Sequence, residues 1–502
     1  MQEEKTIFTA TPKRAYALDA LRGFAVLSMI LSGTIAYRIL PAWMYHAQEP
    51  PPNHTYNPNL PGLTWVDLVF PIFLFSMGAA IPLALSSRLA KGNSIPEIIV
   101  YIFKRGFLLA AFAIVLQHFR PTVISSEPNV QKWWLALWGF LILFLMFVRL
   151  PNAWQRWQRL TITTVAWVSA IALLSQLRYP DGSGFSLYRS DIILIVLANT
   201  AVFGSLIWLF TKSNLWLRVG FLGLLFAFRL SATVPKTWIE QLWSASSLFG
   251  SFKFDWLFQF PYLSYLFVVI PGTIAGDLIL GWLKSPAIPE IDSLEADTFD
   301  QQTPQFITSR NHWPTNRFIS IFILIFANCL LLLLGLQTRL VWQTTLVSAL
   351  FCCSAWVFFA KPNNDTEYLL ANLYRWGVYW LIFGLLFEPF QGGIKKDPAT
   401  FSYYFVTTGI SIFILILLLI SIDVFGGRKW FKLLIDNGQN PMIAYVGFAN
   451  LVWPILVLTG IDSWFIQNTK TQAFGFFKGV IYTLLVACIV SLFTRLKLFW
   501  RS

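Results

Sequence analysis

Two histidines and an aspartate lie close together early in the chain. His46 and His54 stand in a segment rich in proline and asparagine, and Asp67 follows at the start of an apolar run. A carboxylate that hydrogen-bonds a histidine fixes its tautomer and stabilises its protonated form, so this pairing is the usual arrangement of a general base. These residues therefore predict proton-transfer chemistry where a polar loop meets an apolar helix.

Each of these residues also has an ordinary structural explanation. Asp67 could simply cap its helix, because a carboxylate in the first turn is favoured by the helix dipole. Either histidine could be a plain loop residue, and the residues alone do not choose between them. His46 follows aromatic residues suited to the membrane interface, whereas His54 follows a stiff run of three prolines. His118, at the end of a later apolar run, could join the same site.

The chain that must position these residues is strongly apolar. Its 502 residues are 56% hydrophobic, 17% aromatic and only 12% charged, a composition outside the range of soluble globular domains. Apolar runs of roughly 20 residues, the length that crosses a bilayer core, recur about twelve to fourteen times along the chain. We therefore expect an all-α fold, a polytopic transmembrane helical bundle of about 12–14 spans.

The net charge of +13 indicates membrane topology and not a nucleic-acid partner, because the basic residues stand singly or in pairs between apolar runs. The positive-inside rule then places both termini in the cytoplasm and the histidine loop on the extracytoplasmic side. We predict a multi-pass protein of the inner (plasma) membrane, with the lipid bilayer as a partner. A homodimer is compatible with this arrangement. The four cysteines lie in apolar stretches without paired spacing, which predicts neither a disulfide nor a metal site.

The spans and polar segments divide the chain into four predicted parts. They are a cytoplasmic N-terminal tail at 1–16, an N-terminal transmembrane half at 17–283 with the catalytic-like loop 41–64, a cytoplasmic acidic loop at 284–316, and a C-terminal transmembrane half at 317–502.

Two motifs flank the histidine loop. They are Leu18-Asp19-Ala20-Leu21-Arg22-Gly23 before it, and Gly62-Leu63-Thr64 with Asp67-Leu68-Val69-Phe70-Pro71 after it. Together they closely resemble the catalytic region of the heparan-α-glucosaminide N-acetyltransferase family and its bacterial relatives. Weaker echoes follow at Pro271-Gly272-Thr273, at Ser402-Tyr403 with Lys395 and Lys396 upstream, and at Gly438-Gln439-Asn440-Pro441.

The resemblance implies a transmembrane acetyltransferase. Such an enzyme moves an acetyl group from cytoplasmic acetyl-coenzyme A to an amino sugar or another glycan acceptor on the extracytoplasmic side. The family's catalytic histidine is followed by alanine, as His46 is by Ala47, which favours His46 over His54. The family's aspartate after the Gly-Leu-Thr segment matches Asp67.

The phosphates of coenzyme A call for cations on the cytoplasmic face, because guanidinium matches phosphate geometry. Arg22, Lys104 and Arg105 are the candidates, and Asn440 could bind from the same side. The ordinary alternatives are anchoring of the helix ends by positive charge for the three cations and capping of a helix for Asn440.

A transporter or flippase of a glycan or another small solute is the competing function. It is suggested by the number of spans and by Asp277, Arg375 and Glu388, which stand in apolar runs where charges are expensive. Transporters of this size often contain internal repeats, and the two halves of this chain show no convincing duplication. The sequence therefore favours the enzyme.

Overall fold

The computed structural model describes residues 14–150, 154–245, 247–249, 252–285, 312–469 and 471–500. Nearly all of the predicted N-terminal tail and acidic loop lies outside these residues. The division of the chain into two transmembrane halves stays a prediction.

Thirteen helical segments within the described residues are long and apolar enough to span a membrane, which confirms the predicted polytopic bundle. They are α1 (Tyr16–Thr34), α2 (Trp65–Ala90), α3 (Ile95–His118), α5 (Val130–Phe147), α6 (Arg156–Gln176), α7 (Ile192–Thr211), Phe260–Lys284 with α10 (Leu266–Lys284), α11 (Thr315–Gln337), α12 (Val341–Phe358), α13 (Asp365–Leu386), Phe401–Val424 with α14 (Phe401–Leu419), Pro441–Leu458 with α16 (Pro441–Gly447) and α17 (Trp453–Leu458), and α19 (Gln472–Arg495).

The remaining elements are shorter. They are α4 (Pro121–Ile124), α8 (Leu215–Ser231), α9 (Trp238–Trp243), α15 (Lys432–Gln439), α18 (Ile461–Asn468) and an antiparallel pair of short strands, β1 (Ser247–Phe249) and β2 (Phe252–Lys253). Helix α8 is largely apolar, but it has only 17 residues. At about 1.5 Å per residue it reaches roughly 26 Å, slightly less than a typical hydrocarbon core.

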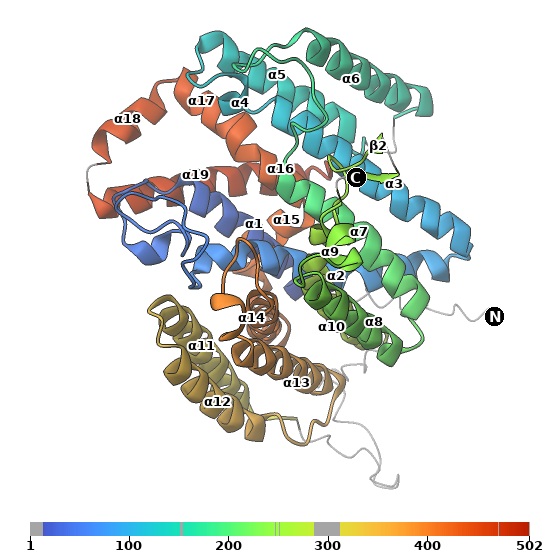
Figure 1. Ribbon diagram of the computed structural model, residues 1–502, viewed down its shortest axis with the longest axis vertical. Helices are drawn as coiled ribbons and strands as arrows, with labels where there is room; N and C mark the ends of the chain where they lie inside the picture. The colour runs from blue at the N-terminus through green and yellow to red at the C-terminus, as the bar shows by residue number, and fades with distance from the viewer. Residues whose placement is uncertain are drawn as a thin grey trace, which may run out of the picture.

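Helix α2 crosses the middle of the bundle, with α3 to α6 on one side of it and α11 to α14 on the other (Figure 1). Glycines let its backbone touch that of α10. A Cβ atom at Gly272 would lie 2.5 Å from the carbonyl oxygen of Phe75, and one at Gly276 would lie 2.3 Å from that of Ala79. Small residues bring transmembrane helices together in this way, so the position of α2 is closely defined.

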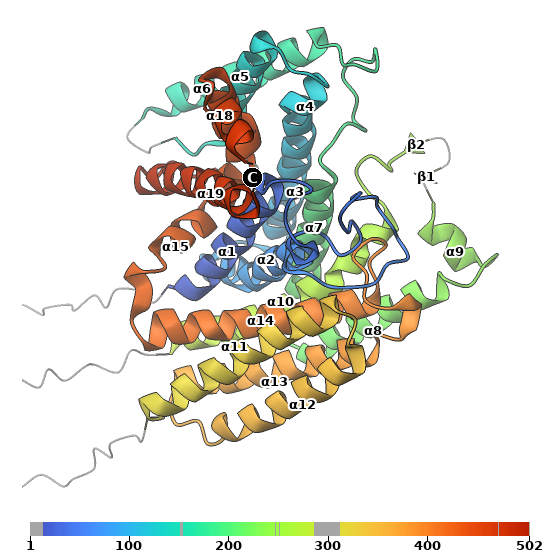
Figure 2. The same ribbon diagram turned by 90° about the vertical axis from the view of Figure 1, so that its left-hand side faces the viewer.

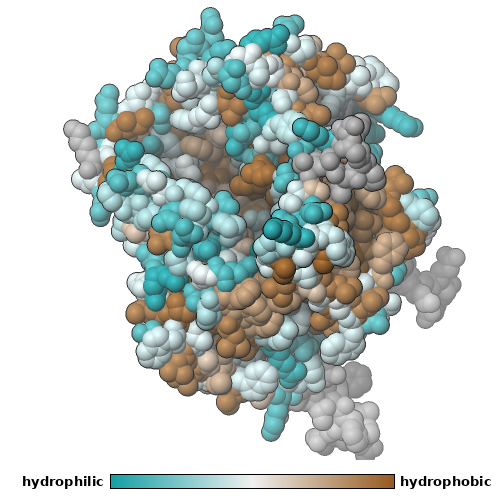
Figure 3. Space-filling model, in the orientation of Figure 1, coloured by the Kyte–Doolittle hydropathy of each residue, from teal (hydrophilic) through white to brown (hydrophobic). Residues whose placement is uncertain are grey.

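The loop after α1 and the segment before α14 meet at one end of the bundle (Figure 2). We call this the loop end, defined by residues 41–64 and 387–400, and we call the opposite end, where α2 stops and α3 begins, the far end. Hydrophobic side chains cover broad areas of the surface, including much of the region over α11 to α14 (Figure 3). Such exposed apolar faces suit a multi-pass membrane protein in contact with lipid.

Candidate active site

The Asp67 carboxylate caps α2 from within its first turn. Its Oδ2 atom accepts hydrogen bonds from the backbone N–H of Thr64 at 3.1 Å and from the Thr64 hydroxyl at 3.0 Å. These contacts belong to a capping box that the sequence Thr64-Trp65-Val66-Asp67 encodes. Asp67 therefore does cap its helix, as its ordinary structural explanation predicts.

The same carboxylate also holds His46. Its second oxygen, Oδ1, lies 2.7 Å from Nδ1 of the imidazole, and Oδ2 accepts from the backbone N–H of Ala47 at 3.2 Å. The Asp67 side chain is 3% exposed and that of His46 is 34% exposed. With the Nδ1 proton directed at the carboxylate, Nε2 is the nitrogen that carries the lone pair. A buried acid therefore orients a half-exposed base.

A proline explains how α14 reaches this turn. Pro71 has no N–H group, so the carbonyl of Asp67, four residues earlier, lacks its usual partner inside the helix. The Tyr403 hydroxyl, which comes from α14, donates to this carbonyl oxygen at 2.8 Å. The hydroxyl replaces the missing backbone donor and ties the first turn of α2 to α14.

Lys396 is the third polar group of the site. Its Nζ atom lies 3.2 Å from Nδ1 and 3.4 Å from Nε2 of His46, at the edge of the imidazole ring. Partial burial lowers the pKa of Lys396 below its ordinary value, and the Asp67 carboxylate opposes this shift without cancelling it. The structure thus places a cation, a carboxylate and a base together.

Loop 41–64 and segment 387–400 are fastened to each other beside Lys396. The Gln48 side chain donates to the Asp397 carbonyl at 2.5 Å and accepts from the Asp397 N–H at 2.9 Å. The Tyr56 hydroxyl donates to the same carbonyl at 2.6 Å, and the N–H of Gly62 donates to Ile394 at 2.9 Å. These bonds set the distance between His46 and Lys396.

The other two histidine candidates have different surroundings. His54 is buried between the rings of Tyr37 and Tyr45, whose centroids lie 4.2 and 4.5 Å away, and its Nδ1 lies 3.1 Å from the carbonyl of Glu49. His118 is buried in a contact with the segment after α6, where its Nε2 accepts from the N–H of Ser186 at 3.3 Å. Among the hydrogen bonds of the described residues, only His46 brings an imidazole to Asp67.

Arg22 is the one predicted cofactor residue that lines a large pocket. This pocket, at the far end, has a volume of about 740 Å³ and also contains Arg14, Arg88 and Lys91. Arg22 donates to the carbonyls of Gly438 and Ser76 at 3.1 and 3.4 Å, and its Nη1 lies 3.6 Å from the Asp19 carboxylate.

The remaining predicted cofactor residues lie outside the lining. Lys104 and Arg105 are exposed on α3, although the Arg105 guanidinium is 5.9 Å from the centre of the Tyr101 ring, which does line the pocket. Asn440 is buried, donates to the carbonyl of Leu498 at 2.8 Å and accepts from the N–H of Trp500 at 3.2 Å. Its amide fastens the last described residues of the chain and does not cap a helix.

The intramembrane charges that suggested transport are mostly neutralised. Asp277 pairs with Arg218 at 2.5 Å, and Glu388 pairs with Arg339 at 3.3 Å. Arg375 is exposed, with its guanidinium 5.9 Å from the centre of the Trp356 ring. Paired charges of this kind stabilise helix packing and do not by themselves make a solute path. In the described part of the chain, His, Cys, Asp and Glu form no group of three that could hold a metal ion.

Sequence reasoning missed Lys396 as a member of the site. It lies 350 positions from His46, so no local spacing could connect the two. The only signal was the echo at Ser402-Tyr403, which has Lys395 and Lys396 just upstream.

One comparison with known proteins covers the part of the chain that contains His46 and Asp67. A family model described as "Domain of unknown function (DUF5009)" matches residues 14–279. Human heparan-alpha-glucosaminide N-acetyltransferase is 34% identical over 109 residues, a match that covers 22% of this chain. The same match spans only 14% of the human protein's length.

Proposed function

We propose that this chain, which belongs to the DUF5009 family, is a membrane-embedded acetyltransferase. It moves an acetyl group from acetyl-coenzyme A to an amino sugar or another glycan acceptor at the loop end. The observation that carries the proposal is the 2.7 Å contact between His46 Nδ1 and the Asp67 carboxylate. The similarity to a human N-acetyltransferase supports the reaction class.

His46 acts as the general base in this reaction. Its Nε2 atom takes the proton from the acceptor amine or hydroxyl as that group attacks the thioester carbonyl carbon. The C–S bond then breaks, the acetyl group stays on the acceptor, and the sulfur leaves as the coenzyme A thiolate. Asp67 stabilises the imidazolium that forms. Attack by His46 itself, through an acetyl-histidine intermediate, uses the same two residues.

Lys396 supplies positive charge where negative charge develops. The tetrahedral intermediate places charge on the former carbonyl oxygen, and a fixed cation in a partly buried site stabilises it more than water does. The 3.4 Å distance between Lys396 Nζ and His46 Nε2 puts the ammonium beside the nitrogen that receives the proton. The same ammonium can balance the negative charge of the leaving thiolate.

The far-end pocket is the proposed site for the phosphates of coenzyme A. Its four cations, with Asp19 as the one carboxylate among the lining residues, suit a polyanion. Helix α2 joins the two places, because Asp67 lies in its first turn and Arg88 lies in its last turn. These residues are 21 positions apart, roughly 30 Å of helix and similar to the thickness of a bilayer core. With the far end in the cytoplasm, donor and acceptor would approach from opposite sides.

The test compares two histidines of the same loop. Membranes that contain His46→Ala or His54→Ala are given labelled acetyl-coenzyme A and a panel of amino sugars, and acetyl transfer is measured. We expect His46→Ala to lower the rate by about 100-fold or more, the range for loss of a general base. His54→Ala is the matched control, because its ring contacts Tyr37 and Tyr45 instead of Asp67.

A fall in transfer for both variants together with poor expression would indicate misfolding. Each variant is therefore first checked for a monodisperse elution profile in detergent. Full activity of a well-folded His46→Ala protein would overturn the assignment of the base.

A further inference from the structure

A second cavity lies away from the active site, between α3 and α6. It has a volume of about 350 Å³. Ala111 and Ile114 of α3 and Ile171 and Leu174 of α6 line it, together with Phe185. Apart from Ser175 and two indole N–H groups, the lining side chains are hydrocarbon. We call this cavity the α3–α6 slot.

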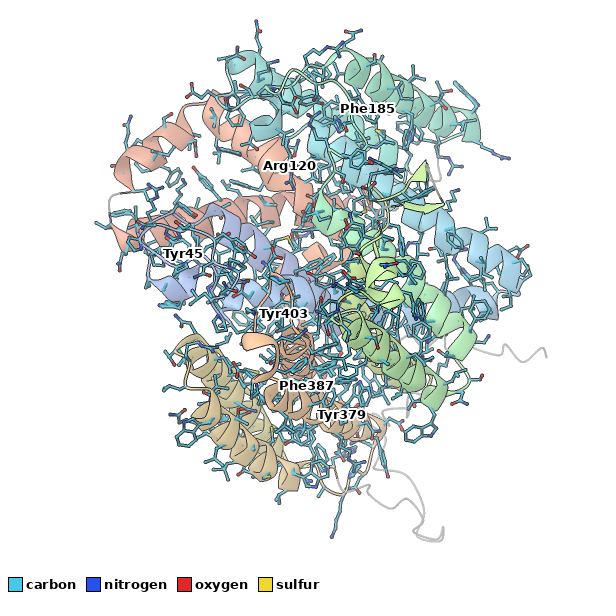
Figure 4. All side chains as sticks on the ribbon, in the orientation of Figure 1. Tyr45, Arg120, Phe185, Tyr379, Phe387 and Tyr403 are labelled. Carbon is cyan, nitrogen blue, oxygen red and sulfur yellow. The ribbon has the colours of Figure 1, made fainter. Side chains whose placement is uncertain are left out.

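The α3–α6 slot belongs to the half of the bundle nearer the loop end. Its lining residues come from the second half of α3, which ends at His118, and from the second half of α6, which ends at Gln176. Figure 4 places Phe185 beside these helices and far from Tyr403 of the active site. Water in such a slot would find few hydrogen-bond partners, so the suitable occupant is an apolar chain.

A cation without a counter-charge stands beside the slot. Arg178 follows the last turn of α6 and is exposed, and none of the ion pairs found among the described residues includes it. A Cβ atom at Gly184 would lie 2.7 Å from Arg178 Nη1, which places the guanidinium beside Gly184, the residue before Phe185. The nearby carboxylate of Asp181 is paired with Arg189 at 2.7 Å.

We propose that the α3–α6 slot binds the hydrocarbon chain of an anionic phospholipid whose phosphate contacts Arg178. An apolar slot in the membrane half of two helices, followed at the interface by an unpaired guanidinium, matches the chain and head of such a lipid. Guanidinium binds phosphate through paired hydrogen bonds, and a net negative head group gains further from the unpaired positive charge. This site is separate from acetyl transfer and does not depend on it.

The bound lipid fills space that protein side chains leave open. Helix α6 packs mainly on α5, so the slot separates it from α3. A lipid chain in the slot contacts Phe185, whose ring stacks on His118 with centroids 4.9 Å apart. The lipid thereby supports the segment that connects α6 to α7.

The test uses photo-crosslinking in liposomes. The full-length protein is reconstituted in phosphatidylcholine with a trace of phosphatidylglycerol that carries a diazirine in its acyl chain. After irradiation, labelled peptides are mapped by mass spectrometry. We expect the label to concentrate in residues 107–115 and 167–175 of the unaltered protein, a result that needs no variant to fold. A uniform distribution of label over the outward faces of α5 and α6 would overturn the site.

Two substitutions test the binding of the hydrocarbon chain and the binding of the head group separately. Ala111→Phe fills the slot and is expected to lower labelling at least about 5-fold, whereas Val165→Phe places the same ring on the exposed face of α6 and should leave labelling unchanged. Arg178→Gln should lower labelling by phosphatidylglycerol about 5-fold, since one interfacial cation contributes about 1 kcal/mol. It should lower labelling by a diazirine phosphatidylcholine less, because the choline cation already balances the charge of that phosphate. No fall for either lipid would overturn the phosphate contact, and an equal fall for both would overturn the preference for an anionic head group. Equal labelling of Ala111→Phe and Val165→Phe would overturn the slot.

Discussion

The two ends of α2 carry charge in opposite ways. At the loop end, the Asp67 carboxylate is 3% exposed and contacts His46, Ala47 and Thr64. At the far end, a pocket of about 740 Å³ is lined by several cations, and Arg88 there lies 3.3 Å from the centre of the Tyr101 ring. The Asp67 carboxylate is buried and bonded through both of its oxygens, whereas the far-end pocket is open and lined mainly by positive charge.

This difference matches the roles proposed for the two ends. A proton-transfer site gains from groups held in one geometry, because misplacement by about 1 Å can cost 100-fold in rate. A site for a flexible polyanion gains from a concentration of positive charge, which attracts the ligand without a single fixed contact. We therefore expect substitutions at the loop end to change kcat and substitutions at the far end to change the KM for the donor.

The largest effect is expected from Asp67→Asn. The amide cannot stabilise an imidazolium, so kcat for acetyl transfer should fall by about 100- to 10,000-fold, the range for loss of general-base function. Because Asp67 also caps α2, a thermal melt in detergent must accompany the assay. A folded Asp67→Asn protein with unchanged kcat would break the contrast between the two ends.

Lys396→Met should lower kcat by about 100-fold, as expected for loss of one electrostatic contact to the transition state. The pKa of Lys396 is lowered mainly by burial, so the ammonium loses its proton at a lower pH than an exposed lysine does. Activity of the unaltered protein should therefore fall as the pH rises through this lowered pKa. The measurement is the pH profile of kcat.

Lys395→Met is the matched control, since it removes the neighbouring lysine of the same segment. The alkaline decline should persist in Lys395→Met and be absent from Lys396→Met. A decline of the same shape in both variants would assign it to another group.

Arg22→Gln should raise the KM for acetyl-coenzyme A about 10-fold with little change in kcat, because a hydrogen bond to a charged group contributes about 1.5 kcal/mol. Lys104→Gln is the control, because Lys104 is exposed and lies outside the pocket lining. Initial rates at varied donor concentration measure both constants. A loss of kcat at constant KM would place Arg22 in the chemistry and remove the distinction between the ends.

The smallest effect is expected from Gln48→Ala. Loss of its two hydrogen bonds to Asp397 should destabilise the fold by about 1–2 kcal/mol and lower kcat a few-fold, through a looser position of Lys396. Asn59→Ala, an exposed change in the same loop, serves for comparison. If both variants behave alike in a thermal melt and in the transfer assay, the Gln48 contact does not position the site.

Hydropathy was enough to predict most of the fold. Thirteen helical segments of the described residues could cross a membrane, within the predicted range of about 12–14 spans. Helix α8, at 17 residues, is too short by this measure. A run of apolar residues is a local property, and so is the length that a bilayer requires. Short elements such as α15 depend on contacts with α1, and hydropathy carries no information about those contacts.

The site was harder to predict because its members meet only in the folded chain. The sequence placed Asp67 in a first turn near two histidines, and local spacing could go no further. What separates His46 from His54 is the packing of Tyr37 and Tyr45 on the second ring. Asn440 shows the converse, since a polar residue before a helix looked available while its amide is already bonded to Leu498 and Trp500.

The bonds between Gln48 and Asp397 join two stretches of the chain that lie far apart in the gene. The family match ends at residue 279, so the region that defines the family contributes His46 and Asp67 but lacks the lysine beside them. If the gene were divided between α10 and α11, neither product alone would possess a complete centre. Activity would return only when both fragments are produced in the same membrane, which makes the active site a shared property of two stretches of the gene.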